Sequence, residues 1–74
     1  MGERVVRMTS REVETILRRH GFMLISQKGS HRKWRNEAAK RQTIVPEHKG
    51  SALPLGTLLS IMKGANIPES EWKR

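Results

Sequence analysis

The chain has 74 residues, which gives one small domain whose thin core removes only roughly 60% of the unfolded surface from water. Lys and Arg number 15 against seven Glu and no Asp, and the net charge of +8 favours polyanions such as nucleic acid, or an acidic protein, as partners. The absence of cysteine excludes disulfides and thiolate metal sites, and no apolar run is long enough for a membrane span or a signal peptide, so we expect a cytoplasmic protein.

The first eight residues are expected to form a short arm ahead of a single domain that covers residues 9–74. This domain begins with a predicted helix over residues 10–20. Thr9 and Glu12 form a T-x-x-E capping box that marks the start of the helix, and Gly21 tolerates the left-handed conformation needed at its end. The apolar stripe at helical spacing consists of Val13, Ile16 and Leu17.

Three short segments with β-branched and aromatic residues follow this helix and predict an antiparallel meander. They are FMLISQK at residues 22–28, HRKWRN at 31–36 and RQTIVPEH at 41–48. Pro46 is expected to end the third strand, because proline has no amide hydrogen to donate to a ladder.

A second helix is predicted after Pro54, which suits a first helical turn. Its broad apolar face comprises Leu55, Leu58, Leu59, Ile61, Met62 and Ala65. The order of elements predicts an α+β fold, α-β-β-β-α, with both helices on one face of a three-stranded antiparallel sheet. The open opposite face carries apolar side chains, which would suit a protein partner that covers it.

Strand alternation divides the second strand into two faces. One face carries Arg32, Trp34 and Asn36, and the other carries His31, Lys33 and Arg35. Trp34 is the natural core residue, so His31 is expected to point outward.

The segment around His31 has the groups needed to hold an RNA phosphodiester. Gly29 permits a positive φ and the close approach of another backbone, and Ser30 adds a hydroxyl. The surrounding cations are Lys28, Arg32, Lys33 and Arg35. Because the 2′-hydroxyl of RNA is an internal nucleophile, one general base with cations that stabilise the developing negative charge can suffice without a metal ion, and His31 could be that base.

A second candidate, His48, lies in VPEHKG on the loop after the third strand, beside Lys49. It could donate to a phosphate or act as a second acid or base. Solvated histidines without a chemical role remain the alternative for both His31 and His48. Neither a metal nor another cofactor is expected, because the three histidines match no compact ligand spacing and no cysteine or aspartate exists to complete a site.

Four motifs in order resemble the HicA family of bacterial toxin ribonucleases. They are HGF at residues 20–22, GSH at 29–31, VPEHKG at 45–50 and GTLLSIMKGANI at 56–67. This resemblance covers nearly all of residues 9–67 and implies a double-stranded-RNA-binding-like fold. It implies that His31 corresponds to the catalytic histidine and Gly29 to the glycine that opens the same segment. Arg32 stands where the family often has a second histidine, and a guanidinium stays protonated and cannot act as a base.

The resemblance also implies an mRNA-cleaving toxin that a HicB-type antitoxin holds inactive. The leading hypothesis is therefore a small endoribonuclease, an mRNA interferase, that uses His31 and no metal. We expect a HicB-type antitoxin to cover the open sheet face. The alternatives are a noncatalytic RNA-binding module of the same fold and a protein-interaction adaptor. The expected RNA-binding residues are Lys28, Gly29, Ser30, Arg32, Lys33, Arg35, His48 and Lys49.

Overall fold

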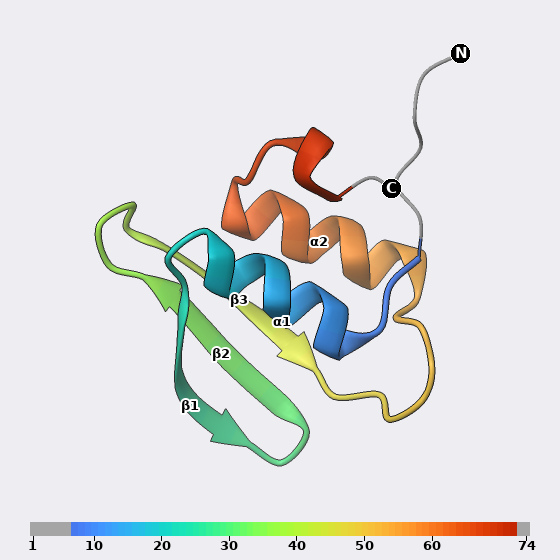
Figure 1. Cartoon of the computed structure of the whole chain (residues 1–74). Helices are drawn as coiled ribbons and strands as arrows, with labels where there is room; N and C mark the ends of the chain where they lie inside the picture. Colours follow the sequence, from blue (N-terminus) through green and yellow to red (C-terminus); the bar gives the residue numbers. More distant parts are fainter. Residues whose placement is uncertain (1–6, 73–74) are drawn as a thin grey trace.

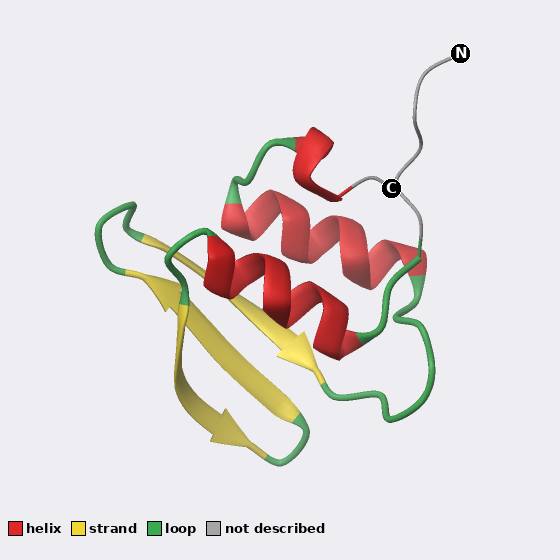
Figure 2. Ribbon diagram, viewed as in Figure 1, coloured by secondary structure: helices red, strands yellow, loops and turns green. Residues whose placement is uncertain are grey.

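The computed structural model describes residues 7–72 and confirms the predicted α-β-β-β-α order. The antiparallel sheet has the strand order β1-β2-β3, and both long helices lie over the same face of it (Figures 1 and 2). The elements are helix α1 (Ser10–Arg19), strands β1 (Met23–Lys28), β2 (His31–Asn36) and β3 (Arg41–Pro46), helix α2 (Leu55–Ala65) and a short 3-10 helix, η1 (Glu69–Trp72).

Helix α1 starts at the predicted capping box. The Glu12 amide donates to Thr9 Oγ1 at 3.2 Å, and the Thr9 amide donates to Glu12 Oε1 at 2.9 Å. The helix ends one residue earlier than predicted, because His20 is the C-cap residue and Gly21 adopts a φ of +88°. Both ends of α1 therefore follow from local backbone chemistry.

The segment that precedes α1 packs against the loop that precedes α2. Met8 is buried, and its carbonyl accepts a hydrogen bond from the Leu53 amide at 2.7 Å. Thr9 and Ala52 form an isolated antiparallel bridge beside it. Residues 1–6 of the predicted arm lie outside the described residues, as do residues 73–74.

Strand β1 is irregular. It begins at Met23, one residue later than predicted, and its pairing with β2 shifts between Leu24 and Ser26. This shift is a β-bulge, which places the extra residue Ile25 together with Ser26 opposite Lys33. The bulge explains why apolar residues do not simply alternate along this strand.

The core lies between the helices and the inner face of the sheet. Trp34 of β2 is 1% exposed, and Val45 of β3 is fully buried beside it. Trp72 of η1 is also fully buried, so the short C-terminal helix closes this core. Strand β3 ends at Pro46 as predicted.

The apolar face of α2 is narrower than predicted. The inward side chains are Leu58, Ile61, Met62 and Ala65. Leu55 and Leu59 are 48% and 47% exposed, and their spacing of four residues places them on one solvent-facing stripe. None of the helices in residues 7–72 is long and apolar enough to cross a membrane.

Candidate functional site

Strand β2 carries the centre of the candidate site. The expected orientation is confirmed, because His31 is exposed on the open face of the sheet while Trp34 is buried on the inner face. Alternation along the strand places Lys33 on the same open face as His31. His31 therefore projects into solvent from the central strand, which is paired on both sides.

A shallow depression of about 300 Å³ surrounds His31 on the open face. It forms because β1 and β3 pair on either side of β2, with Lys28 opposite His31 and Ile44 opposite Lys33. Its lining residues are Ser26, Lys28, His31, Lys33 and Ile44, which include two lysines and no carboxylate. Negative charge in this depression would be stabilised by the two ammonium groups.

The β1–β2 turn borders this depression. Gly29 adopts a φ of +59°, and an added Cβ there would meet nothing within 4 Å in the described part of the chain, so the turn is open on that side, while the Gly29 carbonyl accepts a hydrogen bond from Gln27 Nε2 at 3.0 Å. The Ser30 carbonyl accepts a hydrogen bond from the Glu47 amide at 2.7 Å. This bond holds the loop that carries His48 next to the turn.

Arg32 points to the inner side of β2 and makes a charged network there. Its Nη1 donates to Glu14 Oε1 at 3.0 Å, and its Nη2 lies 3.5 Å from Glu47 Oε2. Glu14 is only 3% exposed and also accepts a hydrogen bond from Trp34 Nε1 at 3.1 Å. These donors offset the cost of a buried carboxylate, so Arg32 and Glu14 fix β2 against α1.

Sequence reasoning did not assign this role to Glu14. One feature of the sequence did indicate that an acceptor is needed. Arg32 and Trp34 share the inner face of β2, where each buried N–H group needs an acceptor. The acceptor itself comes from a helix 18 residues away in the sequence, which strand patterning does not reveal.

A second pocket, of about 430 Å³, lies between the start of α1 and the loop after β3. It brings Arg32, His48 and Lys49 together, apart from the depression around His31. It also contains Arg11, a cation that sequence reasoning did not select although it lies in the first turn of a helix. The lining residues are Thr9, Ser10, Arg11, Glu14, Arg32, Glu47, His48, Lys49 and Gly50.

Arg35 lies on the open face but interacts with an acidic residue of the β2–β3 turn. Its Nε donates to Glu37 Oε1 at 2.8 Å. This hydrogen bond and the charge of Arg35 lower the pKa of the Glu37 carboxyl, and the same contacts raise the pKa of Arg35. Arg35 is thus less available to a phosphate than Lys28 or Lys33.

The comparison with protein families gives a match to residues 10–67, described as the HicA toxin of bacterial toxin–antitoxin systems. The chain belongs to the HicA toxin family. The match runs from the start of α1 to Ile67, so it contains both the strand that carries His31 and the loop that carries His48. A comparison with curated proteins finds no match. The family predicted from the four motifs is therefore confirmed, and the chain is the toxin of a toxin–antitoxin pair.

Proposed function

We propose that this HicA-family toxin is an endoribonuclease that cleaves mRNA in the cytoplasm with His31 as its catalytic residue and without a metal ion. The observation that carries this proposal is the exposed His31 between Lys28 and Lys33 on the open face of the sheet. A HicB-type antitoxin that covers this open face would neutralise the toxin. The lining of the depression suits a phosphodiester better than a divalent cation, because it offers ammonium groups rather than carboxylates.

In the proposed reaction His31 removes the proton from the 2′-hydroxyl beside the scissile phosphate. The 2′-oxygen forms a bond to phosphorus while the bond from phosphorus to the 5′-oxygen breaks. The products are a 2′,3′-cyclic phosphate and a 5′-hydroxyl, which takes up one proton. Lys28 and Lys33 stabilise the negative charge that develops on the phosphoryl oxygens.

The remaining predicted RNA-binding residues would hold the strand on either side of this reaction. Gly29 and Ser30 offer an open turn next to His31. His48 and Lys49 offer a donor and a cation in the second pocket, which the Ser30–Glu47 hydrogen bond keeps close to that turn. Arg32 lines the same pocket and Arg35 borders the open face, so in our proposal both add to the cationic path of the RNA.

His31→Ala tests whether this side chain is catalytic. We expect the substitution to lower the RNA cleavage rate by about 10²- to 10⁴-fold, because it removes the general base. Purified wild-type and variant proteins are incubated with an RNA oligonucleotide and with its 2′-deoxy copy, and the products are separated by size. Only the RNA should be cut, since the deoxy copy lacks the nucleophile.

His20→Ala is the matched control, because His20 caps α1 on the helix side and bonds Glu71 at 3.0 Å. It should cleave at a rate within about threefold of wild type. Equal rates for His31→Ala and wild type would show that His31 is not the catalytic residue. Circular dichroism of each variant checks that the fold is retained.

A noncatalytic RNA-binding module is the second candidate. It is favoured by the lining of the depression, in which neither a second histidine nor a carboxylate accompanies His31. Wild-type protein that binds RNA and leaves it intact under all tested conditions would establish this alternative.

A further inference from the structure

Strand β1 is the least covered element of the sheet. All six of its residues are exposed, whereas β2 and β3 each contain buried residues. It lies at the edge of the sheet, beyond the area that α1 and α2 cover (Figure 1). Even Leu24, which pairs with Trp34 and faces the helix side, is 45% exposed.

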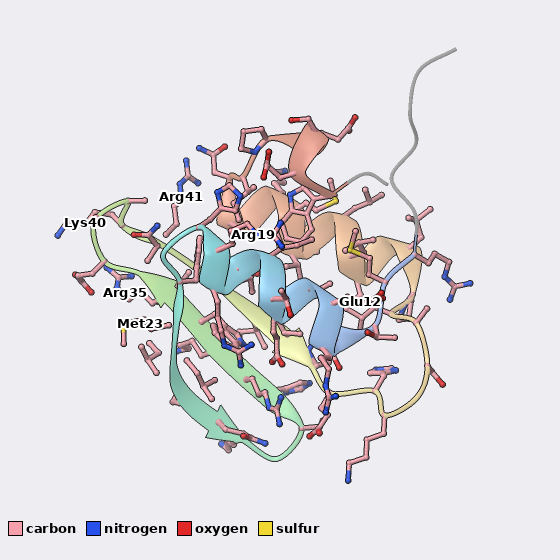
Figure 3. All side chains as sticks on the ribbon, in the orientation of Figure 1. Glu12, Arg19, Met23, Arg35, Lys40 and Arg41 are labelled. Carbon is pink, nitrogen blue, oxygen red and sulfur yellow. The ribbon has the colours of Figure 1, made fainter. Side chains whose placement is uncertain are left out.

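The exposed part of β1 is apolar where a solvated edge strand is expected to be polar. Met23 and Ile25 are 71% and 52% exposed on the open face. With Arg35 they line a depression of about 450 Å³, separate from the one around His31, and its remaining lining residues are Gly21, Asn36, Glu37 and Ala38. Figure 3 shows Met23 and Arg35 close together at this edge. Such a patch on a small protein marks a site for a protein partner.

The backbone of β1 adds a second requirement. Because β1 pairs only with β2 among the described strands, the N–H and C=O groups along its outer edge have no ladder partner in residues 7–72. An added strand would pair with these groups, and its alternate side chains would cover the apolar residues. RNA has neither the alternating amide groups nor the apolar side chains that this edge requires.

The charge of the β1–β2 hairpin indicates which kind of strand would pair with the free edge of β1. Residues 23–36, which make up the β1–β2 hairpin, contain four cationic residues and no acidic residue. Two of the four, Lys28 and Lys33, have no carboxylate partner in the described part of the chain. A second copy of the chain would place like charges against each other, whereas an acidic strand would compensate them.

We propose that the antitoxin adds a β-strand to the free edge of β1, and that apolar and acidic side chains follow one another along the face of this strand that continues the open face of the sheet. An apolar side chain of this strand occupies the depression between Met23 and Ile25. A carboxylate further along it meets Lys28 and Lys33, which closes the approach to His31. The inference rests on the proposed function, since it identifies the surface through which the toxin is neutralised.

The test uses the co-encoded HicB-type antitoxin and toxin variants made in a His31→Ala background. Met23→Glu and Ile25→Glu each place a carboxylate in the apolar depression and should raise the dissociation constant by at least about tenfold. Leu59→Glu is the matched control, because Leu59 is 47% exposed, close to the 52% of Ile25, but lies on α2. It should change the dissociation constant by less than about twofold. Isothermal titration calorimetry measures all three.

Amide hydrogen exchange of the complex tests the strand pairing itself. Outer-edge amides of β1 should exchange at least about tenfold more slowly with the antitoxin bound. The inference would be overturned if the β1 amides exchanged at the same rate with and without the antitoxin. It would also be overturned if both Glu variants bound the antitoxin with wild-type affinity, or if the toxin with the unchanged β1 surface did not bind it.

The cleavage assay keeps this inference separate from the proposed function. In a background with His31 intact, Met23→Glu should cut RNA at the wild-type rate while escaping inhibition by the antitoxin. If the wild-type protein does not cut RNA, the proposed ribonuclease activity is contradicted, but the measured affinities for the antitoxin still test the strand pairing.

Discussion

Glu14 serves two side chains of β2 at once. Its carboxylate accepts from Arg32 Nη1 and from Trp34 Nε1, and the Glu14 residue is 3% exposed. Arg32 also has a buried Nε that finds no hydrogen-bond partner among residues 7–72. The Glu14–Arg32 pair thus anchors the inner face of β2, the strand that presents His31. Loss of this pair would leave unsatisfied polar groups inside the protein.

Glu14→Leu should lower the free energy of unfolding by about 3 kcal/mol, because it leaves Arg32 without its main buried partner. Urea denaturation at neutral pH measures this loss. The double variant Glu14→Leu, Arg32→Met should be more stable than Glu14→Leu alone, because the buried guanidinium without its partner is removed, and Glu47, which also loses Arg32, is partly exposed to water. Additive losses from the two single changes would show that the pair does not interact energetically.

At the level of single residues, the sequence was informative where one strand face or one backbone position decides the outcome. The inward Trp34 and the outward His31 follow from alternation along a strand, and the positive φ of Gly29 follows from its place in a turn. The sequence could not predict that His48 and His31 line different pockets, because that depends on how the loop after β3 folds.

At the level of elements, α1 has a well-defined start. The capping box satisfies two amides that the helix cannot satisfy internally, and Met8 and Val13 are both buried at its base. The same turn lines the second pocket through Ser10 and Arg11. The stability of this helix start therefore also determines the shape of a predicted RNA-binding surface.

Thr9→Ala should reduce the free energy of unfolding by about 1 kcal/mol, because it removes the side-chain acceptor of the capping box. For a domain of this size, such a change lowers the melting temperature by about 4 to 8 °C. Thr15→Ala, on the exposed side of the same helix, is the control and should change stability by less than about 0.5 kcal/mol. Equal effects of the two variants would mean that the cap contributes nothing specific.

The elements differ in how well local chemistry defines them. Strand β2 was predicted with its observed ends, since Gly29 and Ser30 precede it and the turn that starts at Glu37 follows it. The bulge at Ile25 was not predictable, because it reflects the pairing of β1 with β2 rather than a pattern within β1. The solvent-facing Leu55 and Leu59 were missed because hydrophobicity alone does not show which side of α2 packs on β3.

At the level of the whole molecule, the positive charge is unevenly compensated. The acidic side chains of Glu14, Glu37 and Glu47 pair with Arg32, Arg35 and Lys40. Lys28, Lys33 and Lys49 have no carboxylate partner within residues 7–72. Part of the excess charge predicted from composition is therefore free where β2 presents His31 and where the loop after β3 borders the second pocket. Further cations without a carboxylate partner in residues 7–72, among them Arg19 and Lys63, lie on the helices.

This distribution predicts how salt should weaken RNA binding. Each phosphate contact that a lysine makes releases counterions, so the logarithm of the affinity falls with the logarithm of salt concentration by about 0.7 per contact on a single strand. Binding is measured with 2′-O-methyl RNA, which lacks the nucleophile and stays intact. Lys28→Ala and Lys33→Ala should each reduce the steepness of this dependence by about 0.7.

Lys63→Ala is the control, since Lys63 is exposed on α2, which covers the other face of the sheet, and it should leave the slope unchanged. A reduction as large for Lys63→Ala as for Lys33→Ala would mean that RNA responds to the net charge of +8 and not to the cationic depression around His31.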